Sequence, residues 1–465
     1  MLDFKKICKS YEKEALNTLQ KDVQINSIYD PSTITNEMPY GKGVYDCFEF
    51  LKELALKDGF NVDLCDGHCL EISYGKGERL IGIFAHQDVV PVTPGWTHDP
   101  FSGYIDEKEN RMYSRGTSDD KGPGIAAYYA LKALKESDLI KNYRVKLVFG
   151  GDEERGSSCL EYYFHTLKKE DPTYGFTPDA DFPLIYGEKG IVNYKYSGTL
   201  PLNNVISIKA GTVFNVVIDT AIVKVTNAEK LADYLKNHSE VKAERISDDE
   251  FKFIGKAAHG SLPELGFNSG VEALRVLGEV YDNKALSLLA KEYENPNGEN
   301  MGVKYESKDM GATTYNVGVI NYENGKFELI VNFRHPENCN PDEAIEKIQK
   351  VSPLPVFVMS KSPYLYYNPE TTDFIKELYK VYVEETGDTV HKPMAIGGGT
   401  YAKEAKNTIA FGSCFPGKVD HIHEIDEKID LEDFFNSIPI YAHAIYALGN
   451  LNKWEQNINL GQFNI

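Results

Sequence analysis

Apolar and polar residues alternate along the first third of the chain in a way that predicts strands and helices in turn. Residues 79–86 (RLIGIFAH) and 143–151 (YRVKLVFGG) are short apolar runs typical of buried strands. Helical spacing of apolar residues follows at 124–136, directly after Pro123, and again at 157–170. Strands alternating with helices in this way predict a parallel sheet with helices on both faces.

The pattern changes in the middle of the chain. Residues 313–335 contain two strand-like runs around Asn324-Gly325, and Asn-Gly is a strong signal for a β-hairpin. The remaining runs are strand-like at 191–198, 205–211, 221–226 and 355–360, and helix-like at 228–238, 269–293 and 341–351. This mixture predicts a separate α+β domain over residues 191–366.

The last hundred residues return to the first style, with a helix candidate at 371–387, a strand at 407–414 and a helix at 431–451. We therefore expect two domains in a chain of 465 residues, although length alone suggests about three. Residues 1–190 and 367–465 would form one α/β domain with a mixed, mostly parallel sheet, and 191–366 would be inserted into it.

Composition narrows the classes of partner. Asp and Glu number 70 against 50 Lys and Arg, so the formal net charge is −20. Such a field repels phosphate backbones and anionic membrane surfaces, so we expect no nucleic acid and no membrane partner. No run of about 18 apolar residues occurs, and the start lacks the apolar stretch of a signal peptide. The 7 scattered cysteines fit free thiols in a reducing cytoplasm.

Four segments place possible metal ligands just after strand-like runs, at 85–88, 116–122, 150–154 and 420–427. Taken singly, each fits a helix cap, a turn or a solvated acidic face. Because sites in open α/β sheets form beyond the carboxyl ends of strands, all four could meet at one edge. Imidazole and carboxylate together suit zinc, with manganese or cobalt as alternatives. The number of acids favours two metals bridged by a carboxylate.

These segments resemble the di-zinc metallopeptidase family of aminoacylase, carnosinase and carboxypeptidase G, and most of all its bacterial dipeptidase V branch. The resemblance covers nearly the whole chain. It is carried by HQDVVPVTPGW (86–96), DPFSG (99–103), RGTSDDKGP (115–123), GDEERGSS (151–158), PDADFPLIYGEKG (178–190), AAHGSLPELGFNSG (257–270), GGGTYA (397–402) and FPGKVDHIHEIDE (415–427).

The resemblance implies a catalytic domain with an inserted lid built of two ferredoxin-like halves. The implied activity is hydrolysis of unblocked dipeptides by a water that bridges two zinc ions. An aminoacylase, a tripeptidase and a carboxypeptidase-type amidohydrolase on the same scaffold are the alternatives. The large lid resembles that of the monomeric branch of the family, so the resemblance implies a monomer. Small peptides are the expected partners.

Carried over position by position, the resemblance implies five metal ligands: His86, Asp119, Glu154, Asp179 and His423. Asp181 is an alternative to Asp179, because the segment allows a two-residue slip, whereas His421 does not fit the family's His-x-x-Asn-Glu pattern. Asp426 stands where that pattern has Asn, which leaves its role open. The peptide bond after Asp119 is often cis in the family.

The resemblance also implies roles in catalysis and binding. Glu153 corresponds to the general base, Asp88 to the partner that fixes the tautomer of His86, and His259 to a donor for the anionic intermediate. Substrate binding falls to Asn215, Arg334, Gly398, Gly399 and Thr400. Arginine suits a free carboxylate because its guanidinium forms a fork of donors.

Overall fold

The computed structural model describes residues 2–451 and divides the chain into two compact units. Unit 1 contains the described residues up to Tyr186, Tyr367–Met394 and those from Thr400 onward. Unit 2 contains Gly187–Tyr366 and Ala395–Gly399. The predicted first domain also includes residue 1 and residues 452–465, which lie outside the described residues.

The main sheet of unit 1 has parallel strands at its centre. Its order is β1 (Asn61–Asp63), β2 (Cys69–Gly75), β6 (Tyr143–Gly150), β3 (Arg79–His86), β7 (Tyr174–Thr177), β22 (Thr408–Ala410), β9 (Ile185–Glu188) and β20 (Leu365–Tyr366), and β21 (Met394–Ile396) pairs with β9. Of these strands, β20 and parts of β9 and β21 belong to the residues grouped with unit 2. The neighbours β6, β3, β7 and β22 run parallel, and antiparallel strands flank them. The carboxyl ends of β3 and β6 therefore lie side by side.

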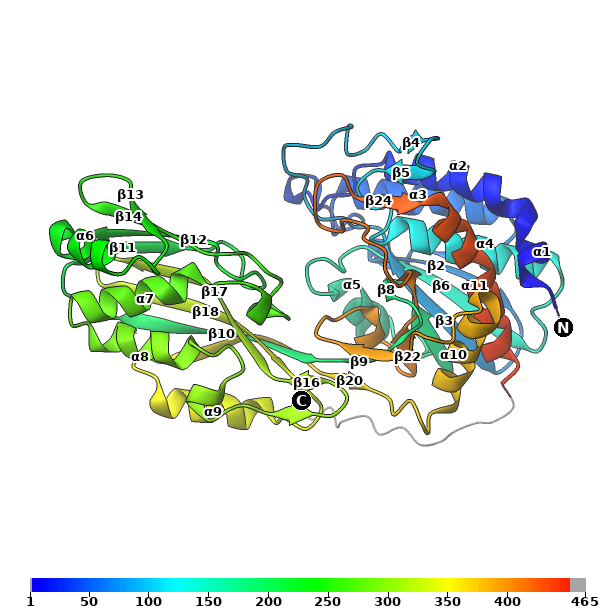
Figure 1. The fold of residues 1–465 in the computed structure, drawn as a ribbon. Coiled ribbons are helices and arrows are strands. Elements are labelled where there is room, and N and C mark those ends of the chain that lie inside the picture. The colour runs from blue at the N-terminus through cyan, green and yellow to red at the C-terminus, as the bar shows by residue number, and fades with distance from the viewer. Residues whose placement is uncertain (1, 452–465) are drawn as a thin grey trace. The chain divides into compact units, whose positions relative to one another are not determined.

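Helices cover this sheet. They are α1 (Phe4–Cys8), α2 (Glu12–Val23), α3 (Lys42–Lys57), α4 (Lys121–Glu136), α5 (Ser158–Glu161), α10 (Asp373–Thr386) and α11 (Leu431–Gly449). The helices α4 and α11 pack on each other and on β3 and β6 (Figure 1). On the other face, Phe84 of β3 packs against Phe164, just after α5. None of the described helices combines the length and the apolar character needed to cross a membrane.

Two predicted elements of unit 1 are shorter than the sequence suggested. The helix expected at 157–170 is α5 followed by one wider helical turn over Tyr162–Thr166. The strand expected at 407–414 is interrupted after β22, and the chain resumes as β23 (Ser413–Cys414), which pairs with β8 (Ala180–Asp181). Gly412 between them has a φ of 80°, which glycine adopts most readily. A small sheet of β24 (Lys428–Asp430), β5 (Arg111–Tyr113) and β4 (Tyr104–Asp106) completes the unit.

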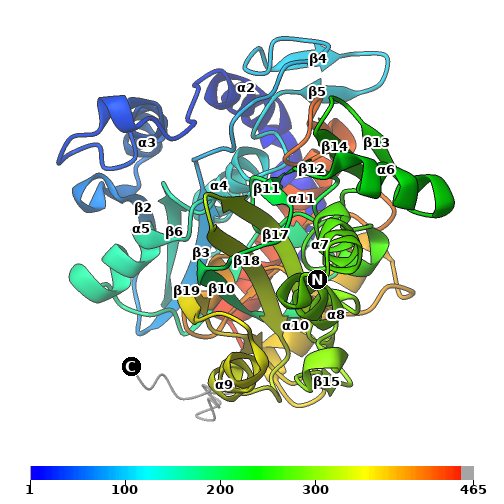
Figure 2. The ribbon, with the colours of Figure 1, turned by 90° about the vertical axis from the view of Figure 1, so that its left-hand side faces the viewer.

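Unit 2 is an antiparallel sheet covered by helices on one face (Figure 2). Its order is β13 (Ala243–Arg245), β14 (Glu250–Ile254), β12 (Thr220–Val225), β11 (Val205–Ala210), β17 (Thr314–Glu323), β18 (Lys326–His335), β10 (Gly190–Thr199) and β19 (Val356–Ser362). The helices are α6 (Ala228–Asn237), α7 (Ser269–Val280), α8 (Lys284–Tyr293) and α9 (Pro341–Val351), and β15 (Glu306–Ser307) pairs with β16 (Gly311–Ala312). The expected hairpin is present, with a φ of 53° at Asn324 and 77° at Gly325.

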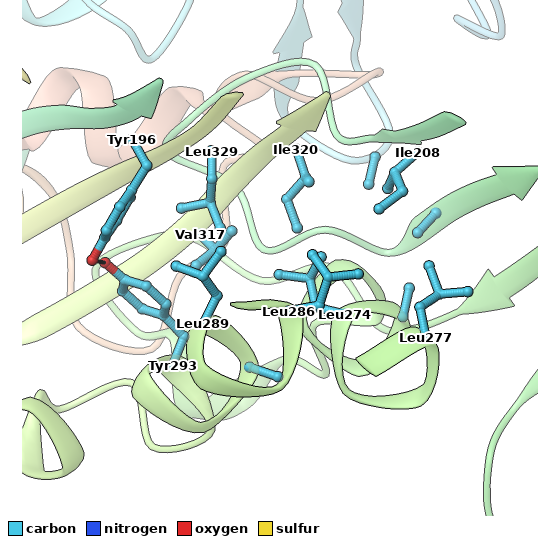
Figure 3. Close-up of a cluster of buried hydrophobic side chains, with 14 of the residues drawn as sticks. Tyr196, Ile208, Leu274, Leu277, Leu286, Leu289, Tyr293, Val317, Ile320 and Leu329 are labelled. Atoms are coloured by element: carbon cyan, nitrogen blue, oxygen red, sulfur yellow. Dashed lines mark hydrogen bonds between the residues drawn. The ribbon is translucent and has the colours of Figure 1, made fainter. Parts of the chain in front are cut away.

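The core of unit 2 lies between the sheet and the helix pair α7 and α8. Leu274, Leu277, Leu286 and Leu289 point from these helices toward apolar side chains of the sheet, such as Leu329 (Figure 3). The single helix predicted at 269–293 is therefore two helices. The chain turns between them at Tyr281–Asn283, where the Asn283 side chain bonds to the main chain of Asn203.

Candidate metal centre

His86 is the last residue of β3, at the carboxyl edge of the sheet. Its Nδ1 lies 2.9 Å from the main-chain oxygen of Asp88, and a carbonyl oxygen only accepts hydrogen bonds, so Nδ1 carries the proton. In the neutral ring Nε2 therefore has the lone pair that a bound cation would use. It lies 2.9 Å from Oδ1 of Asp119 and 3.7 Å from Oδ2 of Asp179. These three side chains form one group able to hold a cation.

A second group shares Asp119 with the first. The other oxygen of that carboxylate, Oδ2, lies 2.9 Å from Nε2 of His423, and the same nitrogen lies 3.2 Å from Oε1 of Glu154. Within each group the candidate ligand atoms lie within 4.8 Å of one another. Asp119 thus turns one oxygen to each group, which is how a carboxylate bridges two metal ions. The Asp119–Asp120 peptide bond is cis.

The structure separates the residues that the sequence left as alternative metal ligands. Asp179 lies in the first group, whereas Asp181 belongs to β8, where it is the register partner of Cys414. His421 pairs through Nδ1 with Glu424 at 2.9 Å and is not in either group. Of these alternatives, Asp179 and His423 are therefore placed to act as ligands, and Asp181 and His421 are not.

Asp88 contacts two parts of the site. Its main-chain oxygen faces His86, as described above, and its carboxylate accepts the backbone N–H groups of Glu153 and Glu154 at 3.1 and 3.0 Å. The carboxylate thereby fixes the turn after β6 that carries both glutamates. Sequence reasoning assigned to Asp88 only the orientation of His86, and it missed this second role.

Glu427 is a buried residue that sequence reasoning did not single out. Its Oε1 accepts the backbone N–H groups of Gly116, Ser118 and Asp119 at 3.0, 3.0 and 3.2 Å. Its Oε2 accepts a hydrogen bond of 2.7 Å from Arg115. One carboxylate thus holds the whole turn that presents Asp119. Its position just after Asp426, in the motif of His423, was the available signal.

Asp426, the departure from the family pattern, has a partner away from both groups. Its two carboxylate oxygens accept the N–H and the hydroxyl of Thr97, each at 2.8 Å. Asp426 therefore ties the loop after His86 to the loop that carries His423. In that second loop His423 has a φ of 63°, a left-handed backbone conformation that is uncommon outside glycine and frequent at functional sites.

Electrostatics show that the residues of this site suit a cation. Burial raises the pKa of Glu153 and of Asp179, and neighbouring carboxylates raise both further. Burial also opposes ionisation of Asp119, but hydrogen bonds with His423 and His86 outweigh it and lower the pKa. So many acids at one edge repel each other unless positive charge lies between them. The mixed imidazole and carboxylate donors match zinc, manganese or cobalt.

The remaining predicted residues lie in unit 2, except Thr400. His259 is paired with Val216 in an isolated bridge, and Gly260 N–H donates to the main-chain oxygen of Asn215 at 2.7 Å. The N–H of Ser261 donates to Nδ1 of His259 at 3.3 Å, and its hydroxyl lies 2.6 Å from the same atom. Because Nδ1 accepts a backbone hydrogen bond, the neutral ring of His259 carries its proton on Nε2.

Arg334 in β18 is buried, at 4% exposure. Its Nη1 donates to the main-chain oxygen of Gly397. Gly398 and Gly399 follow in the segment grouped with unit 2, the first half-buried and the second exposed. Thr400 begins the next stretch of unit 1, where its hydroxyl accepts the N–H of Ala402. The predicted metal ligands thus lie in two groups of unit 1, whereas the residues predicted to bind substrate lie in unit 2, except Thr400 in unit 1.

Comparisons with known proteins agree with this fold. The family described as "Peptidase family M20/M25/M40" matches residues 82–447. The protein named "Putative dipeptidase SH1171", from Staphylococcus haemolyticus, is 34% identical over 476 residues, which cover 96% of this chain and 99% of its own. A protein named "Putative dipeptidase", from Staphylococcus epidermidis, is 34% identical over 462 residues, covering 94% and 97%.

Two solved structures show the same fold at low identity. Dug1p, a di-peptidase from Saccharomyces cerevisiae, has a TM-score of 0.57 and 16% identity, with 96% of this chain and 98% of that chain covered. Human carnosine dipeptidase 1 has a TM-score of 0.56 and 13% identity, with the same coverage.

The family match and the candidate donor set identify a hydrolase of a metal-dependent family, with an α/β unit and an inserted α+β unit. The chain belongs to peptidase family M20/M25/M40 and is a hydrolase that acts on peptide bonds. The family resemblance and the fold class predicted from the sequence are therefore confirmed.

Proposed function

We propose that this protein is a dipeptidase that hydrolyses unblocked dipeptides with two bound dications. His86, Asp119 and Asp179 would hold the first cation, and Asp119, Glu154 and His423 the second. Zinc is the proposed metal, with manganese or cobalt as alternatives. The relatives named as dipeptidases, which align over almost the whole chain, support the choice of substrate.

One observation carries the proposal. The two oxygens of Asp119 each lie 2.9 Å from Nε2 of a different histidine, His86 and His423. A carboxylate that served only one cation would not need a histidine against each oxygen. Two cations held by these residues would lower the pKa of a water molecule toward neutrality and would polarise the scissile carbonyl.

Glu153 is the proposed general base. It neighbours the ligand Glu154, and its backbone is fixed by Asp88. A base at this position takes a proton from the attacking water and passes it to the leaving amine. Burial raises the pKa of Glu153, which makes its carboxylate more basic and better suited to accept that proton.

The residues of unit 2 are proposed to bind the substrate. His259 carries its proton on Nε2, so it can donate to the oxygen that becomes negative during hydrolysis. Arg334 is buried without a carboxylate within 4 Å among the described residues, which suits it to the free carboxylate of a dipeptide. Asn215, Gly398, Gly399 and Thr400 are proposed to contact the peptide.

A substrate panel tests the proposal. Metal-loaded protein is assayed with dipeptides, tripeptides and N-acyl amino acids at equal concentrations. We expect dipeptides to be cleaved with the highest kcat/KM. If N-acyl amino acids or tripeptides were cleaved far faster than any dipeptide, the aminoacylase or tripeptidase alternative would replace the dipeptidase proposal.

We further propose that the protein acts in the cytoplasm as a monomer, and light scattering tests the oligomeric state.

A further inference from the structure

A row of polar side chains crosses four neighbouring strands of unit 2. Asn332 of β18 is the register partner of Asn316 on β17 and of Asn193 on β10, and Asn193 is in turn the partner of Ser360 on β19. The residues adjacent to Asn193 and Asn332 along their strands belong to the core under the helices. Because strand side chains alternate, Asn193 and Asn332 lie on the opposite face of the sheet.

Arg334 fixes the direction of the hydrogen bonds that link Asn332, Asn193 and Ser360. A guanidinium N–H only donates, so the group that Nε of Arg334 contacts at 2.8 Å must be the amide oxygen of Asn332. The amide nitrogen of Asn332 then donates to Oδ1 of Asn193 at 2.7 Å. The nitrogen of Asn193 donates to the hydroxyl of Ser360 at 2.9 Å. The orientation of both amides thus follows from the arginine.

This arrangement leaves one edge of the guanidinium for a ligand. Nε is bound to Asn332, and one N–H of Nη1 is bound to the main-chain oxygen of Gly397. The second N–H of Nη1 and those of Nη2 are not used by any other hydrogen bond or ion pair among residues 2–451. A carboxylate can therefore be bound end-on, with one hydrogen bond from each terminal nitrogen.

Asn332, Asn193 and Ser360 are uncharged, so they leave the positive charge of Arg334 unneutralised. Burial lowers the pKa of Arg334 to about 10, and no charged partner offsets it. A buried cation without a partner is costly, so it strongly favours a ligand that brings a negative charge. An aspartate at position 332 would orient the guanidinium equally well, but it would also neutralise it. Asparagine orients the group and keeps its charge for the ligand.

We propose that Asn332, held in place by Asn193 and Ser360, is a positioning residue that presents Arg334 for end-on binding of the free carboxylate of the substrate. Asn332 thereby determines the preference for a free carboxyl end over an amidated one. This inference rests on the proposed function, in which Arg334 binds that carboxylate. It adds a residue that sets the specificity of the site without contacting the substrate.

The test compares one dipeptide with its C-terminal amide. Values of kcat and KM are measured for the wild type, Arg334→Ala, Asn332→Ala and Asn332→Asp, all metal-loaded. The matched control is Asn321→Ala, which removes an exposed asparagine of β17 away from the row. Melting temperature and metal content are measured for each variant, and the isosteric Asn332→Asp keeps the size of the side chain.

We expect Asn332→Ala to raise KM for the free dipeptide about tenfold, because the guanidinium loses its orientation. Asn332→Asp raises it more, because the new carboxylate pairs with Arg334. For both variants, kcat and the KM for the amide change less than about threefold. Asn321→Ala changes neither constant.

The possible failures are distinguishable. If Arg334→Ala keeps the preference of the wild type for the free carboxyl end, the proposed role of Arg334 is wrong. If Arg334→Ala abolishes the preference while both Asn332 variants keep it, the role of Asn332 is overturned. Equal losses for the free and the amidated dipeptide in the Asn332 variants, with a lower melting temperature, would show a purely structural role and also overturn it.

Discussion

At the scale of single residues, the proposed base and the proposed ligands can be separated by one substitution. Glu153→Gln removes the acceptor for the proton but changes no residue of the two ligand groups. We expect it to keep the bound metal and to lower kcat by a factor of about 10² to 10⁴. Metal analysis and steady-state kinetics measure both, with the exposed Glu107→Gln as the matched control. Near-normal turnover in Glu153→Gln would exclude Glu153 as the base.

The hydrogen bonds to His259 lead to a second prediction. Ser261→Ala removes the hydroxyl beside Nδ1 but keeps the backbone donor. The ring of His259 is then held by one hydrogen bond at Nδ1, so its orientation is less well fixed. We expect a loss of about tenfold in kcat, against 10² to 10³ for His259→Ala. Nitrogen-15 chemical shifts of labelled His259 report the tautomer directly. A protonated Nδ1 in the wild-type neutral ring would contradict the assignment.

The site shows which residues a sequence can reveal. The proposed ligands His86, Asp119 and His423 lie in segments that the strand pattern marked as possible metal-binding segments, and the family resemblance implied their roles. The structure places them in two groups that share Asp119. Asp88 and Glu427 gave no comparable signal for the backbone contacts they make. Their partners lie about 65 and 310 residues away, and such hydrogen bonds depend on tertiary packing.

At the scale of elements, Glu427 connects the loop of the proposed ligand His423 to the turn of the proposed ligand Asp119. We expect Glu427→Gln to weaken binding of the metal about tenfold, because outer partners of ligands typically contribute 10- to 100-fold. Calorimetric titration of metal-free protein with zinc measures this, and Glu424→Gln in the same loop is the control. Glu424 is an exposed residue that pairs with His421. Unchanged affinity in Glu427→Gln would show that the turn holds Asp119 without it.

The packing of α8 predicts a pH dependence of stability. Glu292 is 3% exposed, its Oε2 accepts a hydrogen bond from Tyr196, and burial raises its pKa from 4.5 to about 7. The folded protein therefore keeps a proton that the unfolded chain releases above pH 4.5. The contribution of Glu292 to stability is complete below that pH and is lost as the pH rises to about 7.

Glu292→Gln removes this titration. The free energy of unfolding of the variant, relative to the wild type, should increase by about 3 kcal/mol between pH 4.5 and 7.5, from a shift of roughly 2.5 pH units. Denaturant unfolding at a series of pH values measures the difference, and Glu346→Gln on the exposed face of α9 serves as the control. A difference that is constant with pH would contradict the assignment.

Elements also show where sequence patterns are insufficient. The apolar spacing over 269–293 continues through Tyr281–Asn283, so it predicted one helix. In the structure α7 ends at Val280, and the side chain of Asn283 in the turn bonds to the main chain of Asn203. The hairpin at Asn324-Gly325 was predictable because the two residues themselves favour the turn. Turns that depend on distant partners were not.

At the scale of the whole molecule, two separate segments of the chain supply the proposed metal ligands. His86 comes from the first segment of unit 1 and His423 from the last, and unit 2 is inserted between them. The change of pattern predicts domain boundaries near residues 190 and 366, and the structure groups Gly187–Tyr366 in one compact unit. The residues grouped with unit 2 at Ala395–Gly399 had no counterpart in the sequence pattern.

The measurement that tests the central claim most directly is a titration of metal-free protein with zinc, in which bound metal and dipeptide hydrolysis are followed together. The two ligand groups that share Asp119 predict that activity reaches its maximum when two metal ions are bound per chain. Chelation should abolish it, and returning the metal should restore it. Full activity with one metal per chain, or no hydrolysis of any dipeptide with two, would contradict the account.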